Sequence, residues 1–130
     1  MPRFSTRSKS KLHTCDERLI KLFNKVVKKF DCQILEGHRG QKAQDEAYNK
    51  GNSKVRFPNG KHNRSPSVAV DVAPYPIDWQ DRERFIACAY YIKGRASQMG
   101  IKLRLGADWN GHMRFTESFF DAPHFELVED

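Results

Sequence analysis

The apolar residues between positions 19 and 30 recur every three or four residues, which is the spacing of one face of an α-helix. They are Leu19, Leu22, Phe23, Val26, Val27 and Phe30. The preceding segment TCDE resembles a capping box, with Thr14 as the N-cap and Glu17 at the third helical position. The pattern therefore predicts an amphipathic helix of about four turns that begins after Thr14.

Short apolar segments between turn residues predict β-strands farther along the chain. These segments span residues 32–37, 68–72, 101–106 and 124–128. Two more helical segments lie among them: one ends at Gly51, and a longer one is capped by Asp78 and ended by Gly100. Because strands and helices do not alternate regularly, we expect an α+β fold in which helices pack on one side of a small, largely antiparallel sheet.

A chain of 130 residues suits a single domain. Residues 1–12 are rich in Ser, Lys and Arg, and we expect a flexible basic arm there, followed by one domain over residues 13–130. No segment has the ~20 apolar residues that cross a bilayer, and the N-terminal residues lack the apolar stretch of a secretory signal. We therefore expect a monomer without integral membrane association. The three cysteines have no disulfide or metal-site spacing, so we expect them to be reduced and buried.

The net charge of +7 favours polyanionic partners, which include nucleic acid, an anionic membrane face and an acidic wall polymer. The basic residues gather in residues 3–11, 21–29 and 54–64. These clusters lack the interleaved aromatic residues that stack on single-stranded nucleic acid. We therefore expect no nucleic-acid partner.

Asp71 places a charged group inside the apolar strand predicted at 68–72. In an alternating strand, the three valines of this segment share one face, and Asp71 shares the other face with alanines. Burial of an unpaired carboxylate is costly, so Asp71 needs a partner. An arginine is one candidate, and a metal ion is another.

Two histidines could complete a metal site with Asp71. His62 lies in a long loop over residues 52–66, and loops of this length in compact domains are often functional. His124 opens the last predicted strand. Two imidazoles and a carboxylate form a common zinc donor set, and three protein donors leave a position for water, as in catalytic sites. We expect the remaining histidines to be surface or capping residues: His13, His38 and His112.

These residues resemble a known motif of the VanY-like family, which comprises zinc D-Ala-D-Ala carboxypeptidases and L-alanyl-D-glutamate peptidases. The family motif S-x-H-x-x-G-x-A-x-D is similar to GKHNRSPSVAVD, which supplies His62, Ala69 and Asp71. Two departures are present. Gly60 stands in the place of the serine, and the interval from His62 to Asp71 is two residues longer than in the motif.

Two further motifs support the same resemblance, which covers about residues 19–128 and is strongest to the phage endolysin branch. DAPHFEL places Asp121 at the general-base position and His124 at the third ligand position. Arg39 matches an arginine in the turn between a strand and a helix. The resemblance implies that Zn²⁺ is held by His62, Asp71 and His124. It also implies that Asp121 is the catalytic base and that Arg39 stabilises the oxyanion or binds a substrate carboxylate.

The resemblance also implies a function. We expect a zinc metallopeptidase that hydrolyses the stem peptides of peptidoglycan, the polymer of the bacterial cell wall, at the L-alanyl-D-glutamate bond. Such an endolysin would accumulate in the host cytoplasm and reach the periplasm and wall through a separate membrane pore. Two alternatives stay open: a D-alanyl-D-alanine carboxypeptidase of cell-wall metabolism, and a non-catalytic wall-binding module.

Overall fold

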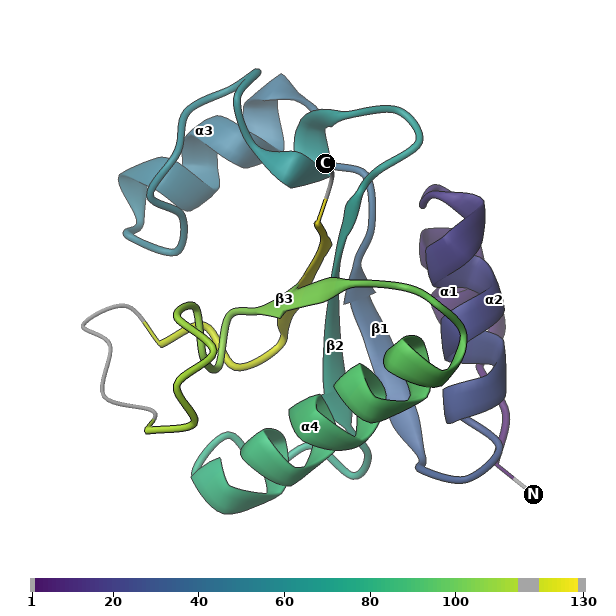
Figure 1. Cartoon of the computed structure of the whole chain (residues 1–130). Helices are drawn as coiled ribbons and strands as arrows, with labels where there is room; N and C mark the ends of the chain where they lie inside the picture. The colour runs from purple at the N-terminus through teal and green to yellow at the C-terminus, as the bar shows by residue number, and fades with distance from the viewer. Residues whose placement is uncertain (1, 115–119, 129–130) are drawn as a thin grey trace.

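A four-stranded antiparallel sheet forms the centre of the computed structural model, which describes residues 2–114 and 120–128 (Figure 1). The strand order is β1-β2-β4-β3. The strands are β1 (Cys32–Glu36), β2 (Ala69–Pro74), β3 (Leu103–Leu105) and β4 (His124–Leu127). Each corresponds to a predicted strand, and the predicted α+β class is confirmed.

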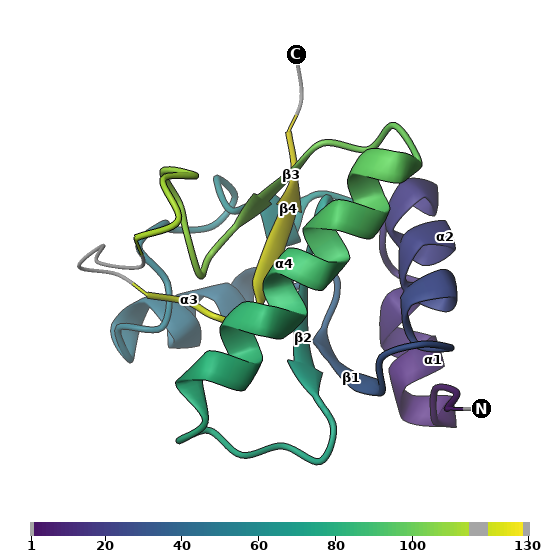
Figure 2. The same cartoon turned by 60° about the horizontal axis from the view of Figure 1, so that its bottom comes forward.

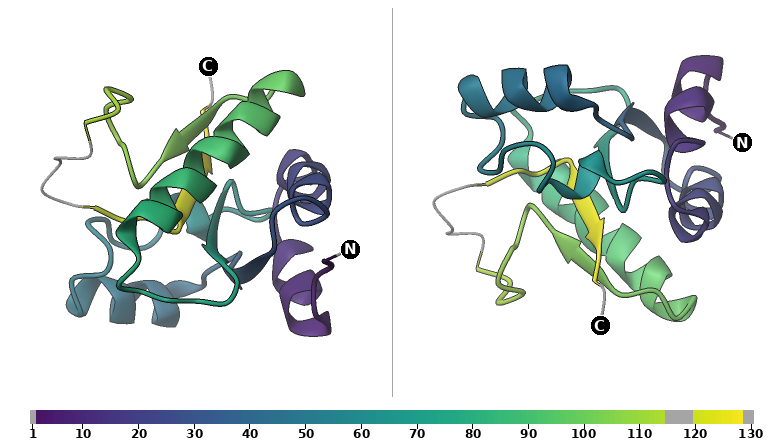
Figure 3. Two further views of the ribbon diagram at one scale, coloured as in Figure 1. Left: turned by 90° about the horizontal axis from the view of Figure 1, so that it is seen from below. Right: turned by 90° about the horizontal axis from the view of Figure 1, so that it is seen from above.

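In the described part of the chain, four helices and one 3-10 turn surround the sheet. They are α1 (Thr6–Leu12), α2 (Glu17–Val26), α3 (Gln41–Asn49), the turn η1 (Lys61–Asn63) and α4 (Arg82–Gln98). Figure 2 shows α4 lying across the sheet, and Figure 3 shows α1 and α2 together on one side with α3 on the opposite side. Among the described residues, no helix combines the length and the apolar character that crossing a membrane requires.

The hydrophobic core lies between α2, α4 and the valine face of β2. Val70 is fully buried there with Phe23 of α2 and Ile92 of α4, and each such side chain contributes about 1.5–3 kcal/mol. Helix α3 contributes none of the described core residues, because its one buried side chain is that of the polar Gln44. The opposite face of β2, which carries Asp71, is therefore left for a functional site. All three cysteines are free and buried, as predicted: Cys15, Cys32 and Cys88.

The prediction of a flexible arm over residues 1–12 is wrong for Thr6–Leu12, which forms α1. Phe4, Ser8 and Leu12 are buried at intervals of four residues, so one side of this segment packs on the protein. The Ser8 hydroxyl accepts a hydrogen bond from the backbone N–H of Ile34 in β1 at 3.2 Å. Two apolar residues and one serine therefore suffice to dock a segment whose composition is typical of disorder.

Two predicted helix starts are also wrong by two or three residues. The N-cap of α2 is Asp16, whose carboxylate accepts from the backbone N–H of Arg18, whereas the Thr14 hydroxyl accepts from the backbone N–H of His38. The N-cap of α4 is Asp81 in place of Asp78. In both cases a second Asp or Thr near the helix start offers an equally good cap, and tertiary contacts select between them.

The docking of α1 can be tested with Leu12→Ala. Leu12 is 1% exposed, so we expect its truncation to lower the free energy of unfolding by about 2–5 kcal/mol, measured by chemical denaturation. Ser10→Ala is the matched control, because Ser10 is an exposed residue of the same helix. Equal stability of the two variants would show that α1 is not docked in solution.

Candidate metal centre

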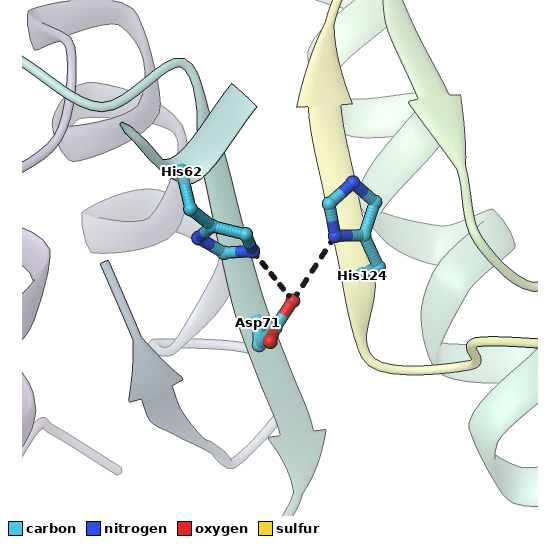
Figure 4. Close-up of side chains that lie close together, drawn as sticks. All are labelled: His62, Asp71 and His124. Carbon is cyan, nitrogen blue, oxygen red and sulfur yellow. Dashed lines mark hydrogen bonds and ion pairs between the residues drawn. The ribbon is translucent and has the colours of Figure 1, made fainter. Parts of the chain in front are cut away.

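Three side chains from separate segments converge on one point, as Figure 4 shows. The Nε2 atom of His62 lies 3.1 Å from Oδ1 of Asp71, and Nδ1 of His124 lies 3.2 Å from the same oxygen. One potential ligand atom from each residue lies within 4.8 Å of the others. Sequence analysis predicted this trio, and the structure brings it together.

The sheet register explains how Asp71 and His124 meet. The two residues are directly paired across β2 and β4, so their side chains leave the same face of the sheet. His62 reaches them from η1, which two backbone hydrogen bonds hold in place. The carbonyl of His62 accepts from the backbone N–H of Arg39 at 2.8 Å, and the carbonyl of Lys61 accepts from that of Val68 at 3.3 Å.

Both imidazoles are oriented by acceptors on their far sides. Nδ1 of His62 donates to the carbonyl of Gly37 at 2.7 Å, and Nε2 of His124 donates to Oε1 of Glu126 at 2.8 Å. In the neutral, metal-binding form of each ring, the proton would stay on the nitrogen that faces the Gly37 carbonyl or the Glu126 carboxylate, and the nitrogen on the Asp71 side would carry a lone pair. Two imidazole lone pairs beside a carboxylate oxygen fit a divalent metal ion.

Glu126 was not found by sequence analysis. It lies two residues after His124 on β4, and alternation along a strand places both side chains on one face. This spacing was the available signal. Burial alone would raise the pKa of Glu126, but the hydrogen bond from His124 and the charges of His124, Arg104 and Lys61 lower it, so the carboxylate stays ionised as an acceptor.

The Asp71 carboxylate is ionised despite its burial. Burial acts to raise its pKa, but hydrogen bonds and electrostatic attraction with His124 and His62 outweigh burial and hold the pKa well below its usual range. Nη2 of Arg39 lies 3.5 Å from the other carboxylate oxygen, Oδ2. Asp71 can therefore serve as an anionic ligand at neutral pH.

Asp121 lies at the edge of this cluster, where it adjoins both histidines and Asp71. Burial and the negative charge of Asp71 raise its pKa to about 6, against the opposing effects of His124, His62 and Arg39. Such a carboxyl group can accept and return a proton near neutral pH. Gly106 permits this placement, because a Cβ there would lie 2.1 Å from the carbonyl oxygen of Asp121.

Arg39 makes a polar contact from each nitrogen of its guanidinium group. Nη2 contacts Asp71, Nε lies 3.6 Å from Oε2 of Glu36, and Nη1 donates to Oε1 of Gln44 at 3.1 Å. A bulge in β1 between Ile34 and Glu36 brings Glu36 opposite Asp71 and directs the chain towards Arg39. The structure therefore places Arg39 beside the cluster.

Gln44 is a second residue that sequence analysis missed, and it connects three parts of the site. Its side chain is buried, at 1% exposure, and makes four hydrogen bonds. Oε1 accepts from Arg39 and, at 3.2 Å, from Nδ2 of Asn63; Nε2 donates to the Ser53 hydroxyl at 2.9 Å and to the Val55 carbonyl at 2.8 Å. The sequence gives no local signal for this position, because its hydrogen bonds depend on the folded loop.

Known proteins resemble this chain in sequence and in fold. Residues 1–128 match the model of a family described as phage L-alanyl-D-glutamate peptidase. The chain belongs to this family. It is 34% identical to the L-alanyl-D-glutamate peptidase of Escherichia phage T5, over 97% of this chain and 98% of that protein. The crystal structure of the Serratia marcescens L-Ala D-Glu endopeptidase ChiX has the same fold, with a TM-score of 0.76 and 22% identity over 98% of this chain and 91% of that one.

The two departures from the motif of this peptidase family have local explanations. Gly60 donates its backbone N–H to Oδ1 of Asn63, and a serine Cβ would lie only 2.6 Å from that oxygen. The longer interval between His62 and Asp71 contains Ser67, which pairs with the segment before α2. The backbone N–H of Ser67 donates to the carbonyl of Thr14, and the carbonyl of Ser67 accepts from the backbone N–H of Asp16. His62 and Asp71 meet in spite of the longer interval.

The other histidines lie outside the cluster. His13, His38 and His112 are exposed, as predicted. The roles of His62, Asp71 and His124 as ligands, and of Asp121 and Arg39 in catalysis, stay predictions at this point.

The metal-free protein should lose stability as the pH rises from about 6.5 to about 9. Burial acts to lower the pKa of His124, but hydrogen bonds with Asp71 and Glu126 raise it from 6.5 to about 9. Protonated His124 therefore stabilises the fold by on the order of 3 kcal/mol below its unfolded pKa of 6.5, and this contribution is lost as the pH rises through about 9. We expect the Tm of chelator-treated protein to fall over this interval.

The control for this measurement is His124→Gln, which has no imidazole to titrate. Its Tm should lack the fall between pH 6.5 and about 9 that the unsubstituted chain shows. Identical pH profiles for the two proteins would contradict the assignment of this fall in Tm to His124.

Gln44→Met should loosen the loop that carries Ser53 and Val55. The methionine has a similar volume but makes none of the four hydrogen bonds, each of which is worth about 0.5–1.5 kcal/mol. Lys54 and Arg56 are exposed trypsin sites in this loop. We expect cleavage there to become at least about tenfold faster under native conditions, as measured by mass spectrometry.

Gln41→Met provides the control, because Gln41 is an exposed residue of the same helix. Cleavage at equal rates in the two variants would show that Gln44 does not hold the loop.

Proposed function

We propose that this protein is a zinc metallopeptidase that hydrolyses the L-alanyl-D-glutamate bond of peptidoglycan stem peptides, and that it acts as a phage endolysin in host cell lysis. The convergence of His62, Asp71 and His124 in a chain of this family carries the proposal. The donor set supports zinc, because two neutral imidazoles and one carboxylate are usual ligands of that ion. The bond follows the name of the family and of the phage T5 relative.

His62, Asp71 and His124 would hold the zinc ion, which would supply a Lewis acid that lowers the pKa of a water molecule towards ~7. Asp121 takes a proton from the attacking water and delivers it to the nitrogen of the leaving D-glutamyl amine as the C–N bond breaks. Its raised pKa of about 6 suits both steps, because the group gains and loses a proton near neutral pH.

Arg39 acts on the negative charge that develops on the carbonyl oxygen during attack. Its guanidinium group is always ionised and is already fixed by Asp71, Glu36 and Gln44, so little reorganisation is needed in the transition state. These contacts favour this role over capture of a distant substrate carboxylate. Of the two roles that the motif allowed, we therefore assign oxyanion stabilisation to Arg39.

The protein acts as a monomer on peptidoglycan, in our proposal, after accumulation in the host cytoplasm and release through a separate membrane pore. The net charge of +7 supports this, because it attracts the protein to the carboxylates of the wall once the membrane is open.

A comparison of three variants tests the proposal. His124→Ala removes a proposed ligand, so the variant should contain no zinc by elemental analysis. It should also no longer lower the turbidity of a suspension of isolated cell walls. Asp121→Asn should keep its zinc, but its activity should fall by about 10²–10⁴-fold, because the amide cannot accept the proton. His112→Ala is the matched control, since His112 is an exposed histidine outside the cluster, and it should keep both properties.

Mass spectrometry of the digest identifies the bond. Release of peptides that begin with D-glutamate is expected, whereas loss of a single terminal alanine would show a D-alanyl-D-alanine carboxypeptidase instead. Binding to walls without any cleavage product, by zinc-loaded protein, would show a non-catalytic wall-binding module.

A further inference from the structure

Two cavities meet at the cluster of His62, Asp71 and His124. The first, the helix-side pocket, has a volume of about 880 Å³ and lies between α3 and the start of α4. The second, the loop-side pocket, has a volume of about 430 Å³ and lies between the loop after α3 and strands β3 and β4. Asp121 and Arg39 line both. A peptide bound across the cluster would therefore place one half in each pocket.

The two pockets differ in charge. Apart from the shared Asp121 and Arg39, three cationic residues and one acidic residue line the loop-side pocket: Lys54, Lys61, Arg104 and Glu126. The helix-side pocket has more acidic than basic residues: Glu36, Glu46, Asp71, Lys50 and Arg82. Glu126, the acid of the loop-side pocket besides the shared Asp121, already accepts a hydrogen bond from His124. An anionic ligand group is therefore stabilised in the loop-side pocket and repelled in the other.

Two of these cations stand close to the reacting centre. Lys61 directly precedes His62 in η1, and Arg104 is paired with Glu126 across β3 and β4. The guanidinium group of Arg104 lies 5.3 Å from the centre of the Trp109 ring, and its Nε donates to the Trp109 carbonyl at 3.3 Å. The same indole lies 5.2 Å from the imidazole of His124, so Arg104 is held near that ligand.

The substrate of the proposed function has its charge on one side of the scissile bond. The L-alanyl side chain is a methyl group. D-Glutamate has two carboxyl groups, and continuation of the peptide through one of them leaves the other free. Small apolar side chains suited to the alanyl half line the helix-side pocket, among them Leu35, Ala43 and Ala47.

We propose that the loop-side pocket is the subsite for the D-glutamyl half of the substrate, and that Lys61 and Arg104 pair with its free carboxylate. The L-alanyl half then occupies the helix-side pocket, which sets the direction of the peptide across the cluster. This inference rests on the proposed function. It adds a determinant of specificity that is separate from the metal ligands and from Asp121.

The test pairs two substrates with two variants. The substrates are a synthetic N-acetyl-L-alanyl-D-glutamyl peptide with its remaining carboxyl group free, and the same peptide with that group converted to an amide. The zinc-loaded chain should prefer the carboxylate. Lys61→Gln and Arg104→Gln should each lower the ratio of kcat/KM for the carboxylate peptide to kcat/KM for the amide peptide by roughly tenfold. The change should come mainly from a higher KM for the carboxylate peptide, and the constants for the amide peptide should change little.

Two further variants show that the effect depends on charge at this place. Lys61→Arg keeps the cation and should retain the preference. Lys50→Gln removes a cation from the helix-side pocket and should leave the ratio of the two substrates unchanged. The preference should also weaken at high salt, because partly exposed ion pairs are screened.

The outcomes separate this inference from the proposed function. If the unsubstituted chain cleaves both peptides and the preference is the same in Lys61→Gln and Arg104→Gln, the subsite assignment is overturned and the peptidase activity stands. An equal loss of preference in Lys50→Gln would also overturn it, because a general effect of net charge would then explain the result. Failure of the zinc-loaded chain to cleave either peptide or isolated walls would count against the proposed function itself.

Discussion

The ionised carboxylate of Asp71 organises the described part of the molecule around the site. It lies on β2 among alanines, where an unpaired charge would cost several kcal/mol. Its partners come from three other segments: His62 from η1, His124 from β4, and Arg39 from the turn between β1 and α3. One negative charge thus holds together segments that are far apart in the sequence, and the apolar core on the opposite face of the sheet supports the strand that carries it.

The groups that hydrogen-bond to these partners of Asp71 are as important for the geometry of the site as the partners themselves. The carbonyl of Gly37 and the carboxylate of Glu126 select which nitrogen of each imidazole faces Asp71, and Gln44 fixes Arg39 relative to η1. Each of these supporting groups is hydrogen-bonded in the absence of any ligand, so the site is shaped before a ligand arrives. Preorganisation of this kind is what an enzyme needs to stabilise charge without first rearranging.

The fold and the central trio could be predicted because their signals are local or strongly periodic. Asp71 stood out as one charge in an alternating strand, and the motifs around His62 and His124 gave the trio. Gln44 could not be found this way, because its hydrogen bonds join residues up to nineteen apart and depend on the folded loop. Helix α1 was missed for a related reason: its composition is typical of a disordered arm, and its stability comes from the surface on which Phe4 and Leu12 pack. The cap at Thr14 failed because its hydroxyl is bonded to His38 instead.

The strand order has a consequence for how the protein acquires its site. Strand β4 lies between β2 and β3 but follows both in the sequence, so among the described strands β3 has no neighbour until β4 arrives. The same insertion delivers His124 to Asp71. Closure of the sheet and completion of the trio are therefore a single event that depends on long-range pairing, which is slow relative to local helix formation. A partly folded chain cannot hold all three groups in place, so the proposed hydrolytic centre would stay inactive until the sheet is whole.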